Sequence, residues 1–237
     1  MATPVNNAPG MPPGLGLMLE PVRALAEAAS LPASLPALSL APRGDDRVVM
    51  VLPGFATTDR STSALRLFLT SIGYRSRAWE IGRNLGFRRT LGALLPRFLA
   101  LTDQQKEPIS LVGWSLGGTM ARELARHYPD RIRDVVTMGS PIMGQRPALD
   151  GSREINIIDQ PPEVPCTAIF SRTDAIVPAE ISQDVRYPNC ENIEVRASHM
   201  GLGVNPGVFF AVADRLAAPT EDRAPFNPPP MLRSWYP

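Results

Sequence analysis

The most constraining feature of this sequence is a short run that predicts a buried strand, a sharp turn and a helix in immediate succession. Residues 109–113 are an apolar run typical of a strand, and residues 116–128 have the apolar spacing of a helix. Ser115 stands between them in the pattern G-x-S-x-G, flanked by Gly113 and Gly117. In such a turn the serine backbone is strained, and the glycines allow strand and helix to approach closely. The run therefore predicts a serine presented at the carboxyl end of a strand.

From residue 47 onward, short apolar runs alternate with helical patterns, as is typical of a mostly parallel sheet covered by helices. With 237 residues and 44% apolar content, the chain is large enough for one full core. The predicted fold class is α/β, with a mostly parallel, twisted sheet and helices on both faces. Strands are predicted at 48–52, 74–79, 109–113, 135–138, 168–170 and 193–195, and helices at 17–29, 61–72, 91–101, 116–128 and 207–217.

Proline-rich segments flank the predicted domain on both sides. Residues 1–46 are interpreted as a peripheral lead-in, with a short helix at 17–29 followed by Leu-Pro turns. The catalytic domain is expected at 47–217, with a short cap insertion at about 140–164. Residues 218–237 are rich in proline and poor in apolar partners, so they predict an extended surface strap or a disordered tail.

Charge and hydropathy exclude several classes of function. The sequence has 24 Lys plus Arg against 23 Asp plus Glu, so no excess charge favours nucleic acid or an anionic membrane. No stretch approaches the roughly 18 to 20 apolar residues of a membrane span, and no basic residue precedes an apolar run near the start. We expect a cytoplasmic protein that acts on a small molecule, with no nucleic-acid partner and no stable membrane insertion.

The only two cysteines are Cys166 and Cys190, a low number that suits a reducing compartment. We expect two small buried side chains. Because each precedes a predicted strand, a disulfide between them stays open as an alternative. The cysteines and histidines show no metal-ligand spacing, so neither a metal nor another cofactor is expected.

A serine hydroxyl needs a base to accept its proton at neutral pH, and histidine has a suitable pKa. Of the two histidines, His127 lies at the far end of the predicted helix, about 18 Å from Ser115 at 1.5 Å per residue. His199 follows the last predicted strand, at the edge where parallel sheets place their sites. His199 is therefore the candidate base.

A carboxylate that orients the imidazole is expected after a strand, between the serine and the histidine in chain order. Asp174 follows the short apolar strand at 168–170 and meets this requirement. The other acids of the interval lack a comparable preceding strand or fall in the wrong part of it; they include Asp134, Asp150, Asp159 and Asp184.

The order Ser115, Asp174, His199 on successive strand ends resembles the α/β-hydrolase superfamily, especially its compact bacterial esterases and lipases. The resemblance covers about residues 47–217, and the Tyr-Pro-Asp-Arg-Ile segment at 128–132 is similar to the turn after that family's nucleophile helix. It implies a serine hydrolase that cleaves carboxylic esters through an acyl-enzyme intermediate.

The Leu-Pro-Gly-Phe segment at 52–55 resembles the family's first oxyanion loop, although many lipases carry His-Gly where Pro53-Gly54 stands here. The resemblance implies that the backbone N–H groups of Phe55 and Leu116 form the oxyanion hole. Apolar residues near the predicted site suggest an acyl-binding groove, with Trp114, Met143 and Met200 as the substrate contacts.

Three other functions compete with ester hydrolysis. An acyltransferase or thioesterase would use the same three residues, so the sequence does not separate them. Epoxide hydrolases and dehalogenases of this superfamily generally have aspartate at the elbow, and Ser115 argues against them. A binding module would be expected to have lost one of the three residues, and all are present.

Overall fold

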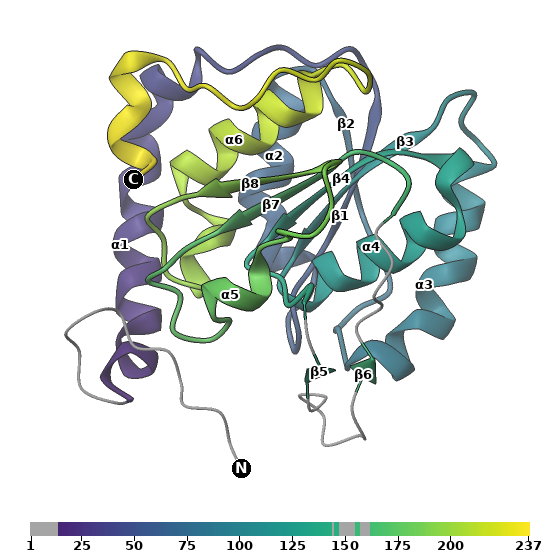
Figure 1. The fold of residues 1–237 in the computed structure, drawn as a ribbon, viewed down its shortest axis with the longest axis horizontal. Helices are drawn as coiled ribbons and strands as arrows, with labels where there is room; N and C mark the ends of the chain where they lie inside the picture. The colour runs from purple at the N-terminus through teal and green to yellow at the C-terminus, as the bar shows by residue number, and fades with distance from the viewer. Residues whose placement is uncertain (1–13, 144, 147–154, 157–161) are drawn as a thin grey trace.

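The computed structural model describes residues 14–143, 145–146, 155–156 and 162–237. Its centre is a six-stranded sheet with the strand order β2-β1-β3-β4-β7-β8, and every neighbouring pair runs parallel. With helices on both faces, this architecture confirms the predicted α/β class (Figure 1). The strands are β1 (Val48–Leu52), β2 (Arg75–Ala78), β3 (Ile109–Trp114), β4 (Ile132–Met138), β7 (Cys166–Phe170) and β8 (Cys190–Glu194).

Two hydrophobic clusters lie between the sheet and its helices, one on each face. One face is covered by α2 (Ser63–Ser71) and α6 (Pro206–Ala217), and the other by α3 (Phe87–Thr102) and α4 (Leu116–His127). The shorter elements are α5 (Ala179–Ser182), η1 (Asp59–Thr62), η2 (Pro129–Arg131), η3 (Met200–Gly203), η4 (Pro230–Trp235) and the antiparallel pair β5 (Gln145–Arg146) and β6 (Ile155–Asn156). The first helix, α1 (Leu15–Leu38), packs against α6 and η3.

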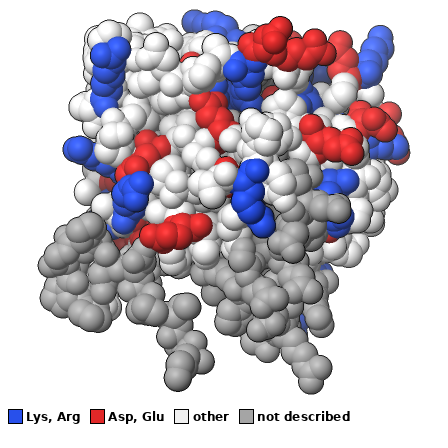
Figure 2. Space-filling model, viewed as in Figure 1, with Lys and Arg blue, Asp and Glu red and all other residues white. Residues whose placement is uncertain are grey.

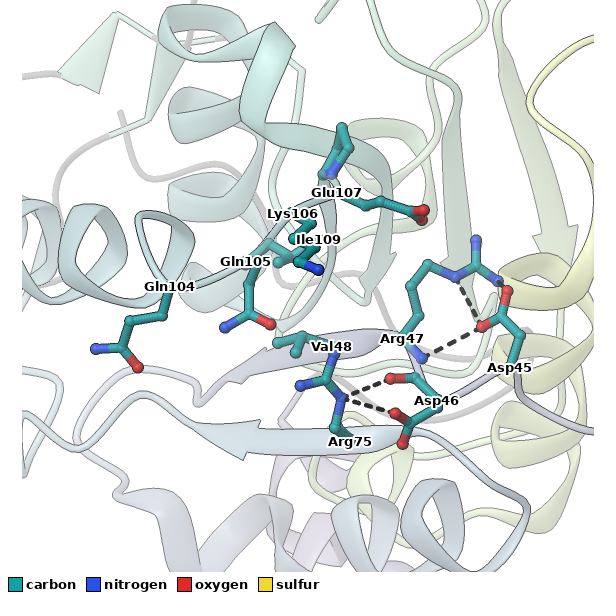
Figure 3. Close-up of a pocket in the computed structure, with 11 residues that line it drawn as sticks. Asp45, Asp46, Arg47, Val48, Arg75, Gln104, Gln105, Lys106, Glu107 and Ile109 are labelled. Carbon is teal, nitrogen blue, oxygen red and sulfur yellow. Dashed lines mark hydrogen bonds and ion pairs between the residues drawn. The ribbon is translucent and has the colours of Figure 1, made fainter.

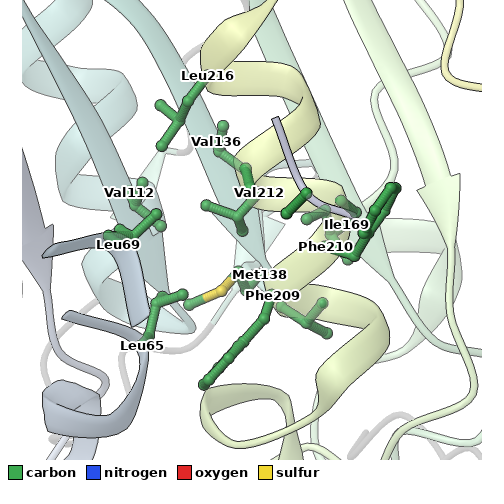
Figure 4. Packing of buried hydrophobic residues seen from close by; sticks show 14 of the residues in the cluster. Leu65, Leu69, Val112, Val136, Met138, Ile169, Phe209, Phe210, Val212 and Leu216 are labelled. Atoms are coloured by element: carbon green, nitrogen blue, oxygen red, sulfur yellow. The ribbon is translucent and has the colours of Figure 1, made fainter. Parts of the chain in front are cut away.

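The central strands are apolar runs because both of their faces are buried. All residues of β1, β3 and β7 are buried, whereas the edge strand β2 alternates between exposed and half-buried residues. On the α6 face, Val136 and Met138 of β4 pack beneath Phe209 and Val212 of α6 (Figure 4). This packing sets α6 against the sheet and leaves the carboxyl ends of the strands free to carry loops.

The first helix is longer than its sequence pattern indicated. The prediction ended it at residue 29, before the Leu-Pro turns, but α1 continues to Leu38 through Pro21, Pro32 and Pro36. All three prolines are exposed, and at 100° per residue their spacing places them on one side of the helix. Water can solvate the carbonyl groups that prolines leave unbonded there, so the helix is not interrupted.

The end of the chain packs on the domain as a strap. The N–H of Arg196 donates to the carbonyl oxygen of Trp235 at 3.3 Å, and the Tyr236 hydroxyl donates to the carbonyl oxygen of Gly207 at 2.8 Å. Most of the predicted cap insertion lies outside the described residues, which include only the short strands β5 and β6 and the two ends of that segment.

Cys166 and Cys190 are buried free thiols that lie opposite one another on the neighbouring strands β7 and β8. They are therefore small buried side chains, and the disulfide alternative is not formed. Within the described residues, no helix combines the length and hydropathy needed to cross a membrane. Positive and negative side chains are interspersed over the face shown in Figure 2.

Candidate active site

Ser115 lies at the sharp turn between β3 and α4, as its pattern predicted. Its backbone has φ 54° and ψ −126°, a conformation that non-glycine residues seldom adopt. Its N–H donates to the carbonyl oxygen of Met138 on the adjacent strand at 2.8 Å, which holds the turn against the sheet. Such strain persists where the surrounding structure imposes it, and it commonly marks a functional position.

The two flanking glycines allow three backbone segments to meet at this turn. A Cβ atom on Gly113 would lie 2.3 Å from the Cα of Gly118, and one on Gly117 would lie 2.4 Å from the carbonyl oxygen of Leu52. Both contacts are with backbone atoms that cannot move aside. The G-x-S-x-G pattern therefore reflects a close approach of β3, α4 and the end of β1.

The structure brings Ser115, His199 and Asp174 together in one hydrogen-bonded chain. The Oγ atom of Ser115 lies 3.0 Å from Nε2 of His199, and Nδ1 of His199 lies 2.6 Å from Oδ2 of Asp174. All three side chains are buried. The second carboxylate oxygen of Asp174 accepts the N–H groups of Ile176 and Val177 at 2.8 and 2.7 Å. A carboxylate held in this way places the proton on Nδ1 and leaves Nε2 free to accept one from the serine.

The loop after β1 lies directly against the serine. A Cβ atom on Gly54 would be 3.2 Å from Cβ of Ser115, so the next residue, Phe55, is beside the turn. The buried Asn84, which sequence reasoning missed, holds this loop. Its side-chain amide donates to the carbonyl oxygen of Pro53 at 2.9 Å, and its backbone carbonyl oxygen accepts the N–H of Ala56 at 2.8 Å.

Two backbone N–H groups flank the serine without acceptors in the part of the chain that the structure describes, those of Phe55 and Leu116. Leu116 is the first residue of α4, so its N–H has no partner within the helix. These are the two residues that the resemblance implied for an oxyanion hole, and they come from the two loops that meet at Ser115.

The three predicted substrate contacts differ in exposure. Met200 follows His199 and its side chain is 43% exposed, whereas Trp114 is 7% exposed and its Nε1 donates to the carbonyl oxygen of His199 at 3.1 Å. Met143 is half-buried against the cluster on the α4 face. The other histidine, His127, lies at the end of α4 and pairs with Glu123, so it takes no part in this arrangement.

Charged side chains of α1 reach the loops that carry Asp174 and His199, and the sequence analysis did not anticipate them. Glu20, Arg23 and Glu27 form hydrogen bonds to these loops. Their spacing of three and four residues was the available signal, since it places three charged groups on one face of an otherwise apolar helix. Among the described residues, no group of three or more His, Cys, Asp and Glu side chains could hold a metal ion.

Comparison with known proteins agrees with the α/β architecture described above. The family model described as the alpha/beta hydrolase fold matches residues 36–186, which is more than half of the chain. No curated protein matches the chain.

Similar solved structures include three hydrolytic enzymes. A pyrethroid hydrolase from Sphingobium faniae has a TM-score of 0.57 and 15% identity, covering 74% of this chain and 99% of its own. The esterase domain of a Rhodothermus marinus protein has a TM-score of 0.53 and 19% identity, with coverages of 75% and 86%. Est1E from Butyrivibrio proteoclasticus has a TM-score of 0.54 and 17% identity, with coverages of 74% and 89%. At these identities the likeness shows the fold.

Proposed function

The chain belongs to the α/β-hydrolase fold family, and we propose that it cleaves carboxylic esters with Ser115 as the nucleophile. One observation carries the proposal: the hydroxyl oxygen of Ser115 lies 3.0 Å from Nε2 of His199, and Nδ1 of His199 lies 2.6 Å from the carboxylate of Asp174. This spacing suits the transfer of a proton from the hydroxyl to Nε2. Esterases among the similar structures support a hydrolytic activity.

In the proposed reaction, Ser115 Oγ attacks the acyl carbonyl while Nε2 of His199 takes its proton. The N–H groups of Phe55 and Leu116 donate to the oxyanion of the tetrahedral intermediate. His199 returns the proton to the departing alcohol, which leaves an acyl-enzyme. Water then attacks the acyl-enzyme and loses its proton to His199, which returns a proton to Ser115 Oγ as the acid is released.

The acyl group of a small-molecule ester is expected to lie beside Met200. Of the three predicted substrate contacts, only this side chain combines a position next to His199 with a large exposed fraction. Trp114 is buried and supports the backbone of the histidine loop, and Met143 is half-buried against the cluster on the α4 face.

The test is turnover of p-nitrophenyl esters of increasing acyl length by the wild type and by Ser115→Ala. Removing the nucleophile should lower kcat by about 10⁶-fold. Ser110→Ala is a matched control, because Ser110 is a buried serine at the opposite end of the same strand, β3, and should keep wild-type turnover. Wild-type turnover by Ser115→Ala would contradict the proposal.

A second assay distinguishes ester hydrolysis from acyl transfer and thioester cleavage, which the same three residues could perform. Products are measured with an added alcohol, and acyl thioesters are compared with oxygen esters of the same acyl group. The proposal expects free acid as the main product and a higher kcat/KM for the oxygen esters.

A further inference from the structure

A buried carboxylate of α1 connects the two loops that carry Asp174 and His199. Glu20 is 1% exposed, although glutamate is seldom buried without partners. Its Oε1 accepts the N–H of Ala175 at 3.0 Å, and its Oε2 accepts the N–H of Met200 at 2.9 Å. Ala175 follows Asp174, and Met200 follows His199, so one carboxylate binds the residue after each of them.

Arg23, one turn further along α1, binds Thr173, the residue before Asp174. Its guanidinium donates to the carbonyl oxygen of Thr173 at 2.6 Å and to the Thr173 hydroxyl at 2.8 Å. It also lies 3.8 Å from Oε1 of Glu20. The residues immediately before and after Asp174 are therefore both held by α1.

Glu27 binds Ser198, the residue before His199, in a similar way. Its Oε1 accepts the N–H of Ser198 at 2.7 Å, and its Oε2 accepts the side-chain amide of Asn205 at 2.9 Å. Ser198 precedes His199, so the residues on both sides of the histidine are also held by α1. Charge-assisted hydrogen bonds of this kind are stronger than bonds between neutral groups.

We propose that Glu20 is a positioning residue, whose carboxylate holds the Asp174 and His199 loops at the separation that the hydrogen-bonded chain requires. The inference rests on the proposed function, in which that chain activates Ser115. Asp174 and His199 come from different strand ends, β7 and β8, and each loop contributes one of the two N–H groups that Glu20 accepts. Glu20 thereby links the two loops directly, and α1 is part of the active-site structure.

The physical reason is that proton transfer depends steeply on geometry. A displacement of about 1 Å caused by a change away from the reacting atoms can lower a rate about 100-fold. In Glu20→Gln the side chain keeps its size, but its NH₂ group would face a backbone N–H in place of an acceptor. One of the two loops must then lose its bond to residue 20, and the direct link between the loops is broken.

The test compares Glu20→Gln with the wild type in ester hydrolysis across a range of pH. We expect kcat to fall about 10- to 100-fold with little change in KM. The pH profile of kcat/KM should change as well, because a displaced Asp174 carboxylate no longer faces the imidazole of His199 as it does in the wild type. A side chain that only stabilised the fold would lower the melting temperature and leave kcat and the pH profile unchanged.

Glu123→Gln is the matched control, since Glu123 is a helical carboxylate of α4 that pairs with Arg126 and His127. It should leave kcat and the pH profile as in the wild type. Arg23→Gln is a second test variant, chosen because the Arg23 side chain is 26% exposed, against 1% for Glu20. It should lower kcat about 3- to 10-fold, since only the Asp174 loop loses a contact.

The outcomes separate this inference from the proposed function. Loss of activity in Ser115→Ala together with wild-type kcat and pH profile in folded Glu20→Gln would overturn the inference and leave the proposed function standing. If Glu20→Gln does not fold, Glu20→Asp decides in the same way, because its carboxylate keeps the charge but is one methylene too short to reach both N–H groups. Activity that survives in Ser115→Ala would overturn the proposed function itself.

Discussion

The two edges of the central sheet both gather charged side chains, but they arrange them differently. At the carboxyl edge, Asp174 and Glu20 accept hydrogen bonds from residues of separate loops, and their oxygens are directed at particular N–H groups. At the amino edge, two arginines form ion pairs with exposed aspartates: the largely buried Arg47 with Asp45, and the exposed Arg75 with Asp46.

The amino edge also contains a cavity. A cavity of about 410 Å³ lies at the starts of β1, β2 and β3, lined by residues 45–48, 75 and 104–109 (Figure 3). Its arginines are already neutralised by the aspartates beside them. In this cavity the charged side chains pair with adjacent residues, whereas at the carboxyl edge groups from different loops are directed at one another. Loops that follow parallel strands converge at the carboxyl edge, which favours such an arrangement there.

Asp134 is the exception at the amino edge, because it is buried on β4. Burial raises its pKa to about 6, and the nearby Arg223 guanidinium opposes this shift. One of its carboxylate oxygens has no hydrogen-bond partner among the described residues. Burial of the charged Asp134 carboxylate therefore costs free energy, and this carboxylate lacks the set of hydrogen bonds that the Asp174 carboxylate accepts.

The largest effect should come from the carboxyl edge. Asp174→Asn removes the acceptor that holds the proton on Nδ1 of His199, and kcat in ester hydrolysis should fall about 10⁴-fold. The control at the amino edge is Asp46→Asn, whose carboxylate is 83% exposed and whose loss should leave kcat unchanged. Equal effects of the two substitutions would remove the distinction between the edges.

A smaller effect is expected from Asp134→Asn, and it should be on stability. The pKa of Asp134 is higher in the folded protein, about 6 against 3.8, so its favourable contribution is complete below about pH 4 and is lost as the pH rises through 6. Two pKa units correspond to about 3 kcal/mol. Asp134→Asn should thus be more stable than the wild type at pH 8, and the two should be equally stable near pH 4. Urea denaturation at both pH values measures this difference, and a constant difference would show that Asp134 is not the titrating group.

The smallest effect is expected from Arg75→Ala at the entrance of the amino-edge cavity. The Arg75–Asp46 pair is solvent-exposed, with side chains 45% and 83% accessible, and such pairs contribute about 0.2–1 kcal/mol. We expect a small decrease in the free energy of unfolding, reduced further by added salt, and unchanged ester hydrolysis. A clear loss of kcat in this variant would show that the amino edge takes part in function.

Much of the sheet could be predicted because its signals are local. The fully buried strand β1 appears as an uninterrupted apolar run at 48–52, and the element boundaries of β3 and α4 were within one residue of those predicted. The edge strand β2 was also within one residue of its predicted range, 74–79, although its side chains are exposed or half-buried. The strands β4 and β8 were placed less precisely, because each begins three residues before its predicted range. The extent of α1 was wrong, because exposed prolines on one side of a helix are tolerated where the sequence pattern suggested turns.

The residues of the candidate site were predictable where neighbouring residues in the sequence, their local context, marked them. Ser115 had its glycines, and Asp174 and His199 each followed a strand. The contacts of Glu20 had no such context, because they join residues 155 and 180 positions apart in the chain. Nor could the sequence distinguish Trp114, which supports the histidine loop from within, from a residue that lines an open groove.

By itself, the amino-acid sequence determined the α/β architecture, the turn at Ser115 and the chain order of the three residues that meet there. Hydrophobic periodicity and glycine spacing are properties of neighbouring residues, so they can be recognised in the sequence alone. Only the tertiary structure decided that a carboxylate from the first helix binds both loops of the site. That contact exists because folding brings three distant segments within hydrogen-bond distance, and burial then requires their polar groups to be paired.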